Sequence, residues 1–326
     1  MKGKLDTLQL TGRMGHLFKS LVLVGLVALS YRARAQQDPM YSQYMFNSLA
    51  INPAYAGSRN VLSATALYRS QWTGVEGAPK TGTFTLDAAL DDRRIGLGLL
   101  IYSDRLGITN TTGTAGSYAY RIRMSRASLS FGIQGSIQQY RANFTDVRLN
   151  NNSAYDPAFA NNSNKILANF GTGVYLNSDK FYVGLSALNL LANQITSNSN
   201  SEKGNNSERS GTRPHLFLAS GFVFTINDDF KLKPSMLIKG VSGAPVEADL
   251  TSTLWIKDVI ALGAQYRTNA DVSGLLEVQA TPQVRIGYSY DHSTTELKGF
   301  NSGSHEIMVR FEFGASRNKI LSPRYF

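Results

Sequence analysis

The sequence predicts an all-β fold, a transmembrane up-and-down antiparallel β-barrel of about 14 strands in an outer membrane. Three observations predict it. Apolar and polar residues alternate with a period of two through most of residues 61–313. The connections between these segments tend to be short and long in alternation along the chain. The first 35 residues carry the order of charge and hydrophobicity that is typical of an export signal.

The N-terminal leader, residues 1–35, is not part of the predicted fold. An apolar run at 21–29 precedes the small-x-small site Ala33-Arg34-Ala35, and the residues before the run are basic: Lys2, Lys4, Arg13 and Lys19. A membrane anchor is the alternative, but the run is much shorter than the roughly 20 residues of a spanning helix. We therefore expect residues 1–35 to be a signal peptide, with Gln36 as the new N-terminus.

Composition excludes several functional classes. The leader carries six Lys/Arg and one Asp, so its removal lowers the formal net charge from +10 to +5. The remaining Lys and Arg are scattered singly, and we expect no nucleic-acid partner. The chain has no cysteine, which excludes a disulfide scaffold and a thiolate metal site.

The strands are predicted from alternation. In residues 128–140, Leu129, Phe131 and Ile133 lie on one face, and Ser130 and Gln134 lie on the other. Residues 246–256 and 305–313 alternate as strictly. The other expected strands are 61–69, 81–90, 93–102, 111–122, 166–176, 181–190, 215–226, 230–240, 259–267, 271–280 and 284–290.

The connections distinguish a barrel from a soluble β-sandwich. The links after even-numbered strands are short: 91–92, 124–125, 177–180, 227–229, 257–258 and 281–283. Several links after odd-numbered strands are long and rich in Asn, Ser and Gly: 141–165, 191–214 and 291–304. One rim with short turns and one with long loops is typical of an outer-membrane barrel, whereas a sandwich gives no reason to sort loops in this way.

Closure of the sheet pairs every backbone amide and carbonyl at membrane depth. We expect the apolar face to meet lipid and the polar face to line the lumen. Aromatic residues near strand ends are expected to form interfacial girdles: Phe181, Phe230, Trp255, Tyr288, Phe311 and Phe313. Charged residues predicted to point inward could bind a solute, but a solvated cross-strand network is favoured: Asp87, Arg121, Lys239, Glu247, Asp249, Arg267, Glu277, Arg285, Arg310 and Glu312.

The sequence offers no convincing catalytic, metal or cofactor site, and we expect a protein that is not an enzyme. The histidines outside the leader, His215, His292 and His305, lack zinc-ligand spacing. The runs 291–293 (Asp-His-Ser) and 304–306 (Ser-His-Glu) are adjacent only in sequence, which does not make a triad. "GLG" (96–98) and "GTG" (171–173) lack the helix start of a phosphate-binding loop. Glycines in such strands are expected to relieve crowding or curvature.

The stretch "AQQDPMYSQYMFNSLAINPAYAG" (35–57) resembles the N-terminal signature of the PorP/SprF family, outer-membrane proteins of the type IX secretion system in Bacteroidetes. Ser48 stands where a proline is expected, and the 193–214 loop is of a kind that varies freely. Further segments are similar to the family's central hairpin, a later strand and its C-terminal end: 169–191, 230–239, 306–313 and 322–326.

The resemblance implies a non-enzymatic barrel that supports export or surface attachment of secreted proteins, including adhesins in gliding relatives. It implies work with a periplasmic ring and an OmpA-like peptidoglycan-binding protein. A general or solute-specific porin is the alternative. The secreted client and the stoichiometry stay open.

The segment before the first strand is dense in aromatic and amide residues, with Asp-Pro and Asn-Pro turns. We expect residues 36–60 to be a periplasmic segment, 61–313 the barrel and 314–326 a periplasmic tail. The segment either contacts a partner or tucks under or into the barrel and seals it. Its expected contact or plug residues are Asp38, Pro39, Tyr41, Gln43, Tyr44, Asn47, Asn52, Pro53, Tyr55 and Gly57.

Overall fold

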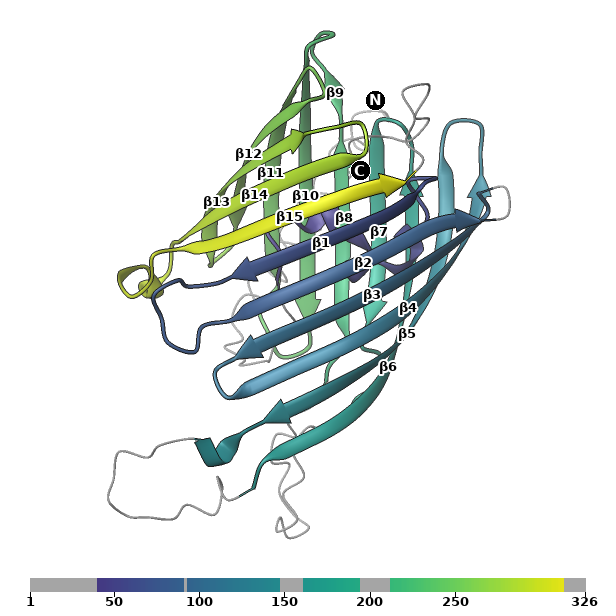
Figure 1. The fold of residues 1–326 in the computed structure, drawn as a ribbon. Coiled ribbons are helices and arrows are strands. Elements are labelled where there is room, and N and C mark those ends of the chain that lie inside the picture. Colours follow the sequence, from purple (N-terminus) through teal and green to yellow (C-terminus); the bar gives the residue numbers. More distant parts are fainter. Residues whose placement is uncertain (1–39, 91–92, 147–160, 194–211, 314–326) are drawn as a thin grey trace, which may run out of the picture.

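A computed structural model describes residues 40–90, 93–146, 161–193 and 212–313. The leader residues 1–35, the contact residues Asp38 and Pro39, and the tail 314–326 lie outside the described residues. The described chain is a closed antiparallel β-barrel with inclined strands and a short helical segment inside it (Figure 1). No helix among the described residues is long and apolar enough to cross a membrane.

Each strand pairs with its neighbours in sequence, and the first strand closes the ring against the last. The strands are β1 (Leu62–Ser70), β2 (Lys80–Leu90), β3 (Ile95–Leu106), β4 (Thr109–Arg123), β5 (Ser128–Ala142), β6 (Ser163–Asn177), β7 (Phe181–Leu188), β8 (His215–Phe222), β9 (Phe224–Thr225), β10 (Phe230–Val241), β11 (Glu247–Ile256), β12 (Ile260–Arg267), β13 (Asp271–Gln279), β14 (Val284–Ser293) and β15 (Ser304–Phe313).

The 15 labelled strands occupy 14 positions in the barrel, because β8 and β9 both pair with β10 in one continuous register. Gly221 faces Ser235 on one side of the break, and Phe224 faces Leu232 on the other. The residue of β10 at the break is Pro234, which has no backbone N–H to donate to the ladder. The predicted single strand 215–226 is therefore interrupted, and the predicted number of strand positions is confirmed.

The two rims differ as predicted. Short turns join β2 to β3, β4 to β5, β6 to β7, β9 to β10, β11 to β12 and β13 to β14, and we call this end the short-turn rim. The longest connections, including 143–162, 189–214 and 294–303, lie at the opposite end, the long-loop rim. The β3–β4 link is only two residues (107–108) because both strands continue further than alternation suggested.

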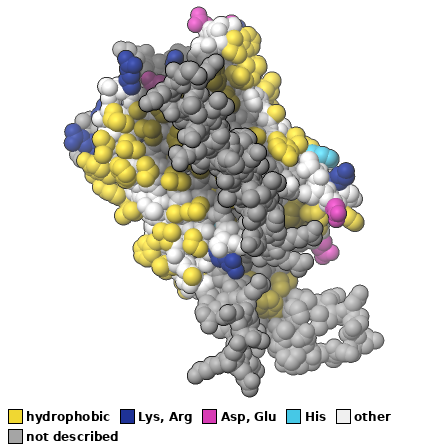
Figure 2. All heavy atoms as spheres, turned by 180° about the vertical axis from the view of Figure 1, so that it is seen from behind, with side chains coloured by type: hydrophobic (Ala, Val, Ile, Leu, Met, Phe, Trp, Pro, Cys, Tyr) yellow, Lys and Arg dark blue, Asp and Glu magenta, His cyan; other side chains and the backbone are white. Residues whose placement is uncertain are grey.

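The outer face is apolar, and hydrophobic side chains cover much of the described surface seen from behind (Figure 2). Phe131, Ile133 and Ile137 of β5 are exposed there, whereas Ser130 and Gln134 are buried inside. Phe230 and Phe313 are exposed at strand ends, as a girdle requires, whereas Tyr288 is exposed in the middle of β14 because that strand continues beyond its predicted end. Trp255 corrects that prediction, because it is 1% exposed and faces the lumen.

Candidate functional site

The candidate site is the segment 41–60, which lies inside the barrel and which we call the plug. It consists of three short turns: η1 (Tyr44–Phe46), α2 (Ser48–Ile51) and η2 (Pro53–Tyr55). The Asn-Pro pair starts the last turn, since the Asn52 side chain accepts a hydrogen bond from Ala54 N at 2.9 Å and proline fits the first helical position. The remaining short helices, η3 (Phe144–Asp146) and η5 (Glu296–Gly299), lie in links at the long-loop rim.

The plug forms much of the interior of the barrel. Tyr44, Phe46, Leu49 and Tyr55 are each less than 5% exposed, and they belong to one cluster of buried apolar residues. The structure therefore places the segment within the lumen, whereas we expected a periplasmic segment. This position matches the alternative in which the segment tucks into the barrel and seals it.

One end of the plug is held by charged residues of β1, β14 and β15. Glu306 accepts hydrogen bonds from the backbone N–H groups of Ser42 and Gln43 at 3.0 and 2.8 Å. The Ser42 hydroxyl donates to Asp291 at 2.7 Å. Arg69 forms ion pairs with Asp291 and Glu306 at 2.6 and 3.1 Å. All five of these residues are buried, so the cluster ties the first residues of the plug to the closing strands.

The other end of the plug is held through its backbone. Asp87 of β2 accepts a hydrogen bond from Gly57 N at 2.9 Å. Arg121 of β4 donates to the carbonyl of Ala56 at 3.2 Å. Because the wall side chains bond to backbone groups of the plug at these points, the contact depends on the backbone conformation of the plug more than on its side chains.

The middle of the plug bonds to β6 and β7. The Asn52 amide donates to the carbonyl of Val174 at 3.0 Å. The hydroxyl of Ser186 donates to the carbonyl of Ile51. Asn52 thus caps a turn of the plug with its oxygen and contacts the wall with its nitrogen.

Phe46 lies between two guanidinium groups. The ring centroid is 5.8 Å from Arg285 and 5.2 Å from Arg310, and Arg310 also donates to the Phe46 carbonyl. Trp255 covers Arg285 at 4.8 Å from its ring centroid. These are cation–π distances, and they give Trp255 a place in the lumen instead of the girdle.

Wall glycines make room for the plug. A Cβ at Gly96 would lie 1.9 Å from the carbonyl oxygen of Ala56, and one at Gly132 would lie 2.2 Å from Ala54 N. A Cβ at Gly173 would lie 2.2 Å from the Asn52 side-chain oxygen. These distances are far below van der Waals contact, so the plug backbone fits only against glycine. Sequence reasoning did not connect these glycines with the plug, and no local signal could have done so.

The predicted contact residues are brought together inside the barrel. Tyr41 is half-buried and shares a hydrogen bond with Thr83 at 2.8 Å. The other described members are buried: Gln43, Tyr44, Asn47, Asn52, Pro53, Tyr55 and Gly57. Their contact with a partner protein stays a prediction.

The charged residues predicted to point inward do so. Lys239 is half-buried, and the others are buried: Asp87, Arg121, Glu247, Asp249, Arg267, Glu277, Arg285, Arg310 and Glu312. Arg267 bridges Asp249 at 2.8 Å and Asp271 at 3.2 Å, and it donates to the Tyr41 carbonyl at 3.3 Å. Arg59 of the plug pairs with Glu312. Ion pairs across strands join Lys239, Glu247, Asp249 and Arg267, as the favoured network predicts, but these residues pack against the plug and are not solvated as the prediction had them.

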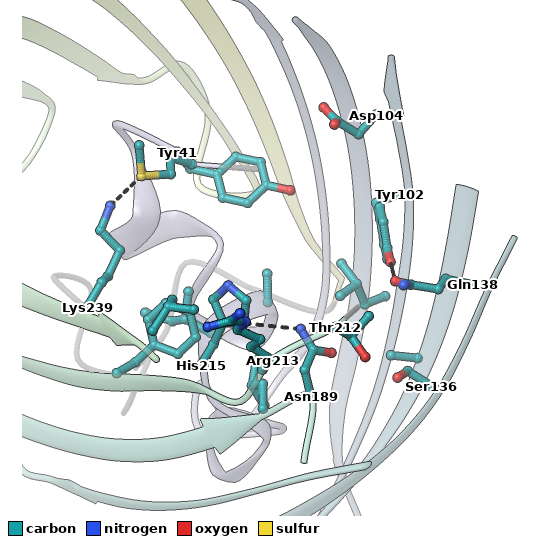
Figure 3. Close-up of a pocket in the computed structure, with 18 of the residues that line it drawn as sticks. Tyr41, Tyr102, Asp104, Ser136, Gln138, Asn189, Thr212, Arg213, His215 and Lys239 are labelled. Atoms are coloured by element: carbon teal, nitrogen blue, oxygen red, sulfur yellow. Dashed lines mark hydrogen bonds between the residues drawn. The ribbon is translucent and has the colours of Figure 1, made fainter. Parts of the chain in front are cut away.

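Between the plug and the long-loop rim lies a cavity of about 170 Å³, which we call the vestibule (Figure 3). The plug residues Tyr41, Tyr44 and Ile51, with the preceding Met40, line its inner end. Tyr102, Asp104, Ser136 and Gln138 stand on one wall, and Arg213, His215 and Lys239 stand on the other. Tyr41 projects into the space between them (Figure 3).

Comparison with known proteins places the chain in a family. The family model described as type IX secretion system membrane protein PorP/SprF matches residues 33–311, which include both plug and barrel. No curated protein matches the chain in sequence.

Solved structures with a similar fold include three bacterial proteins. The outer membrane protein Omp33 of Acinetobacter baumannii is 8% identical, with 78% of this chain and 99% of that chain covered and a TM-score of 0.45. A Pseudomonas aeruginosa FadL homologue is 12% identical, with 86% and 96% covered and a TM-score of 0.46. The NanC porin is 11% identical, with 77% and 98% covered and a TM-score of 0.40.

Proposed function

We propose, since the chain belongs to the PorP/SprF family of type IX secretion system membrane proteins, that it acts in the outer membrane as a plugged, non-enzymatic barrel of that system. In this role it supports export or surface attachment of secreted proteins, adhesins among them. It does so by contact with periplasmic secretion partners, for which the ring and an OmpA-like peptidoglycan-binding protein are the candidates. The family match across plug and barrel is the observation that carries the proposal.

The presence of the plug favours a role for the barrel as a scaffold and not as a channel for secreted clients. Buried ion pairs, backbone hydrogen bonds and glycine contacts hold it on several sides of the lumen. A partly unfolded client would have to break all of these contacts to pass. We therefore propose that clients do not cross this lumen and that partners engage the rims.

The porin alternative makes an opposite prediction. A diffusion porin conducts steadily, whereas a barrel whose lumen holds a buried plug should conduct little. Full-length protein in planar bilayers is expected to show no steady open level at neutral pH. A stable conductance of porin size would favour the alternative.

A non-enzymatic role is part of the proposal. In the run 291–293, Asp291 bonds to Ser42 and Arg69. In the run 304–306, the hydroxyl of Ser304 accepts from Trp72 N at 3.1 Å. These contacts support structural roles for the acids and hydroxyls beside the histidines.

A locked plug tests the scaffold. A Cβ at Gly98 would lie 3.3 Å from the Cβ of Ala56, slightly below the roughly 3.5–4.5 Å of a disulfide, so a small shift would allow a bridge. The chain has no native cysteine, so Ala56→Cys with Gly98→Cys gives a single possible crosslink. Ala56→Cys alone is one control, and Gly98→Cys alone is the other because its Cβ would lie 2.8 Å from Cδ1 of Leu49. We expect oxidised and reduced protein to restore export equally in cells that lack the wild-type gene. Export that stops on oxidation and returns on reduction would show that the plug moves.

Partner contact is tested separately. Deletion of residues 38–56 behind the cleavage site removes most of the plug, leaving only residues 57–60 of it, and removes every predicted contact residue except Gly57. Affinity purification from mildly solubilised outer membrane should recover the periplasmic partners with the wild-type protein. If the gene can be removed without loss of export, the proposed function is wrong. If the deletion variant inserts, keeps its partners and supports export, the segment is not the contact.

We propose that the short-turn rim faces the periplasm and the long-loop rim faces the outside of the cell. Cysteine labelling tests this orientation, and intact mass tests the signal peptide. Asp179→Cys at the short-turn rim should be protected from an impermeant maleimide on intact cells, and Ser302→Cys at the long-loop rim should react. Equal labelling would contradict the orientation. The intact mass of membrane-extracted protein should correspond to a start at Gln36, and a chain that keeps Met1 would contradict the signal peptide.

A further inference from the structure

The vestibule has one wall that offers hydrogen bonds. Gln134, Ser136 and Gln138 occupy alternate positions of β5, so all three face the cavity and are spaced about 7 Å apart along the strand. Tyr102 of β3 donates to the Gln138 side-chain oxygen at 2.6 Å, which fixes the orientation of that amide. An amide and a hydroxyl both donate and accept, so this ladder offers donors and acceptors without a formal charge.

The opposite wall, which also carries Arg213 and Lys239, has an apolar part. Leu188, Phe217 and Leu237 line the cavity there. The rings of His215 and Phe217 stack with centroids 6.2 Å apart and planes 17° from parallel. An apolar face therefore stands across from the hydrogen-bonding ladder.

The charged residues that line the vestibule balance in sign, since Asp104 and Glu247 are acidic and Arg213 and Lys239 are basic, and each of them has a polar protein partner. Lys239 lies 3.5 Å from Glu247 and 3.4 Å from Asp249. Asp104 accepts a hydrogen bond from the Thr81 hydroxyl at 2.6 Å, and Arg213 donates to the Ser242 carbonyl at 2.8 Å. An ionic ligand would have to displace these partners, so the site favours a neutral one.

We propose that the vestibule binds a neutral saccharide unit that enters from the long-loop rim. A pyranose ring carries hydroxyl groups around its edge and C–H groups on its faces. Its edge matches the ladder of β5, and its face matches Phe217 and the neighbouring leucines. The plug closes the cavity from below, so the ligand is held at a dead end rather than passed on. This binding activity goes beyond the proposed role in secretion and does not depend on it.

The test uses the full-length protein in detergent and saturation-transfer difference NMR. Maltotriose and tri-N-acetylchitotriose serve as neutral saccharides, trigalacturonate as the anionic one, and triglycine as a peptide. Saturation transfer is expected from at least one neutral saccharide and not from trigalacturonate or triglycine.

Two neighbouring glutamines give matched variants. Gln138→Leu alters the cavity wall, whereas Gln139→Leu alters the outer face of the same strand, where Gln139 bonds to Asn164 at 2.9 Å. Loss of the lumenal amide should weaken saccharide binding about tenfold, and the outer change should leave it unaltered. Both variants must keep the heat-modifiable gel migration of the folded barrel.

Three outcomes would overturn the proposal. The first is no transfer from either neutral saccharide at millimolar concentration. The second is stronger transfer from trigalacturonate or triglycine, which would point to an ionic or peptide ligand. The third is equal loss of binding in both glutamine variants, which would place the ligand outside the vestibule.

Discussion

On the side of β1, β14 and β15 the plug is held by charge, whereas on the side of β3, β5 and β6 it is held by shape. Glu306 binds two backbone N–H groups of the plug and is itself paired with Arg69. Gly96 and Gly132 instead let the plug backbone approach to distances that no side chain would permit. On the charged side, removal of one ionic partner should destabilise the plug. On the other side, addition of one methyl group to a wall glycine should do so.

The largest effect is expected from Arg69→Met. The change leaves Asp291 and Glu306 as uncompensated buried carboxylates, which typically costs about 3–5 kcal/mol in the free energy of unfolding. Urea unfolding of the full-length protein in lipid vesicles measures it. Arg105→Met, at an exposed position of β3, is the control and should change little.

The carboxylates can be neutralised to check this cause. Adding Asp291→Asn and Glu306→Gln to Arg69→Met should recover part of the lost stability. If the triple variant is less stable than Arg69→Met alone, uncompensated charge is not the reason for the loss.

An intermediate effect is expected from Gly132→Val. Its Cβ would lie 2.2 Å from the plug backbone at Ala54, so plug or wall must shift. Overpacking of this kind costs about 1–3 kcal/mol. Gly135→Val on the same strand is the control, because nothing lies within 4 Å of its Cβ position. Limited proteolysis followed by N-terminal sequencing should show cleavage within residues 41–60 in Gly132→Val only; equal cleavage would refute the fit.

The smallest effect is expected from Phe46→Leu. Leucine keeps an apolar contact but loses the cation–π interaction of the ring with Arg285 and Arg310. Such an interaction between desolvated groups contributes about 1–2 kcal/mol to the free energy of unfolding. The same unfolding measurement applies, and Phe313→Leu on the outer face is the control. A loss as large as that of Arg69→Met would mean that Phe46 organises the charged side as well.

Alternation predicted the strands and the inward charges, because both depend on a period of two within one strand, and the lengths of the connections predicted the barrel and its two rims. The same period places Trp255 on the face of Thr253 and thus in the lumen, so its assignment to the girdle gave too much weight to residue type. The break between β8 and β9 follows from Pro234 in the neighbouring strand, and pairing across strands was needed to see it.

The plug was harder to predict. Its turns are visible in the Asn-Pro pair, and its aromatic content indicated contact, but nothing local says whether that contact is with a partner or with the barrel. The contact of Gly96 with Ala56 joins residues 40 positions apart and depends on barrel radius and side-chain volume together. Periodicity carries no information about either quantity.

The contacts of Ser42 also set an order of assembly. Its partners Asp291 and Glu306 follow it by 249 and 264 residues, and both belong to the last two strands. The final seating of the plug therefore waits until the whole chain has been made. The same strand, β15, pairs with β1 to close the ring and carries Glu306, which binds the plug at Ser42 and Gln43. Completion of the barrel and seating of the plug thus depend on one strand.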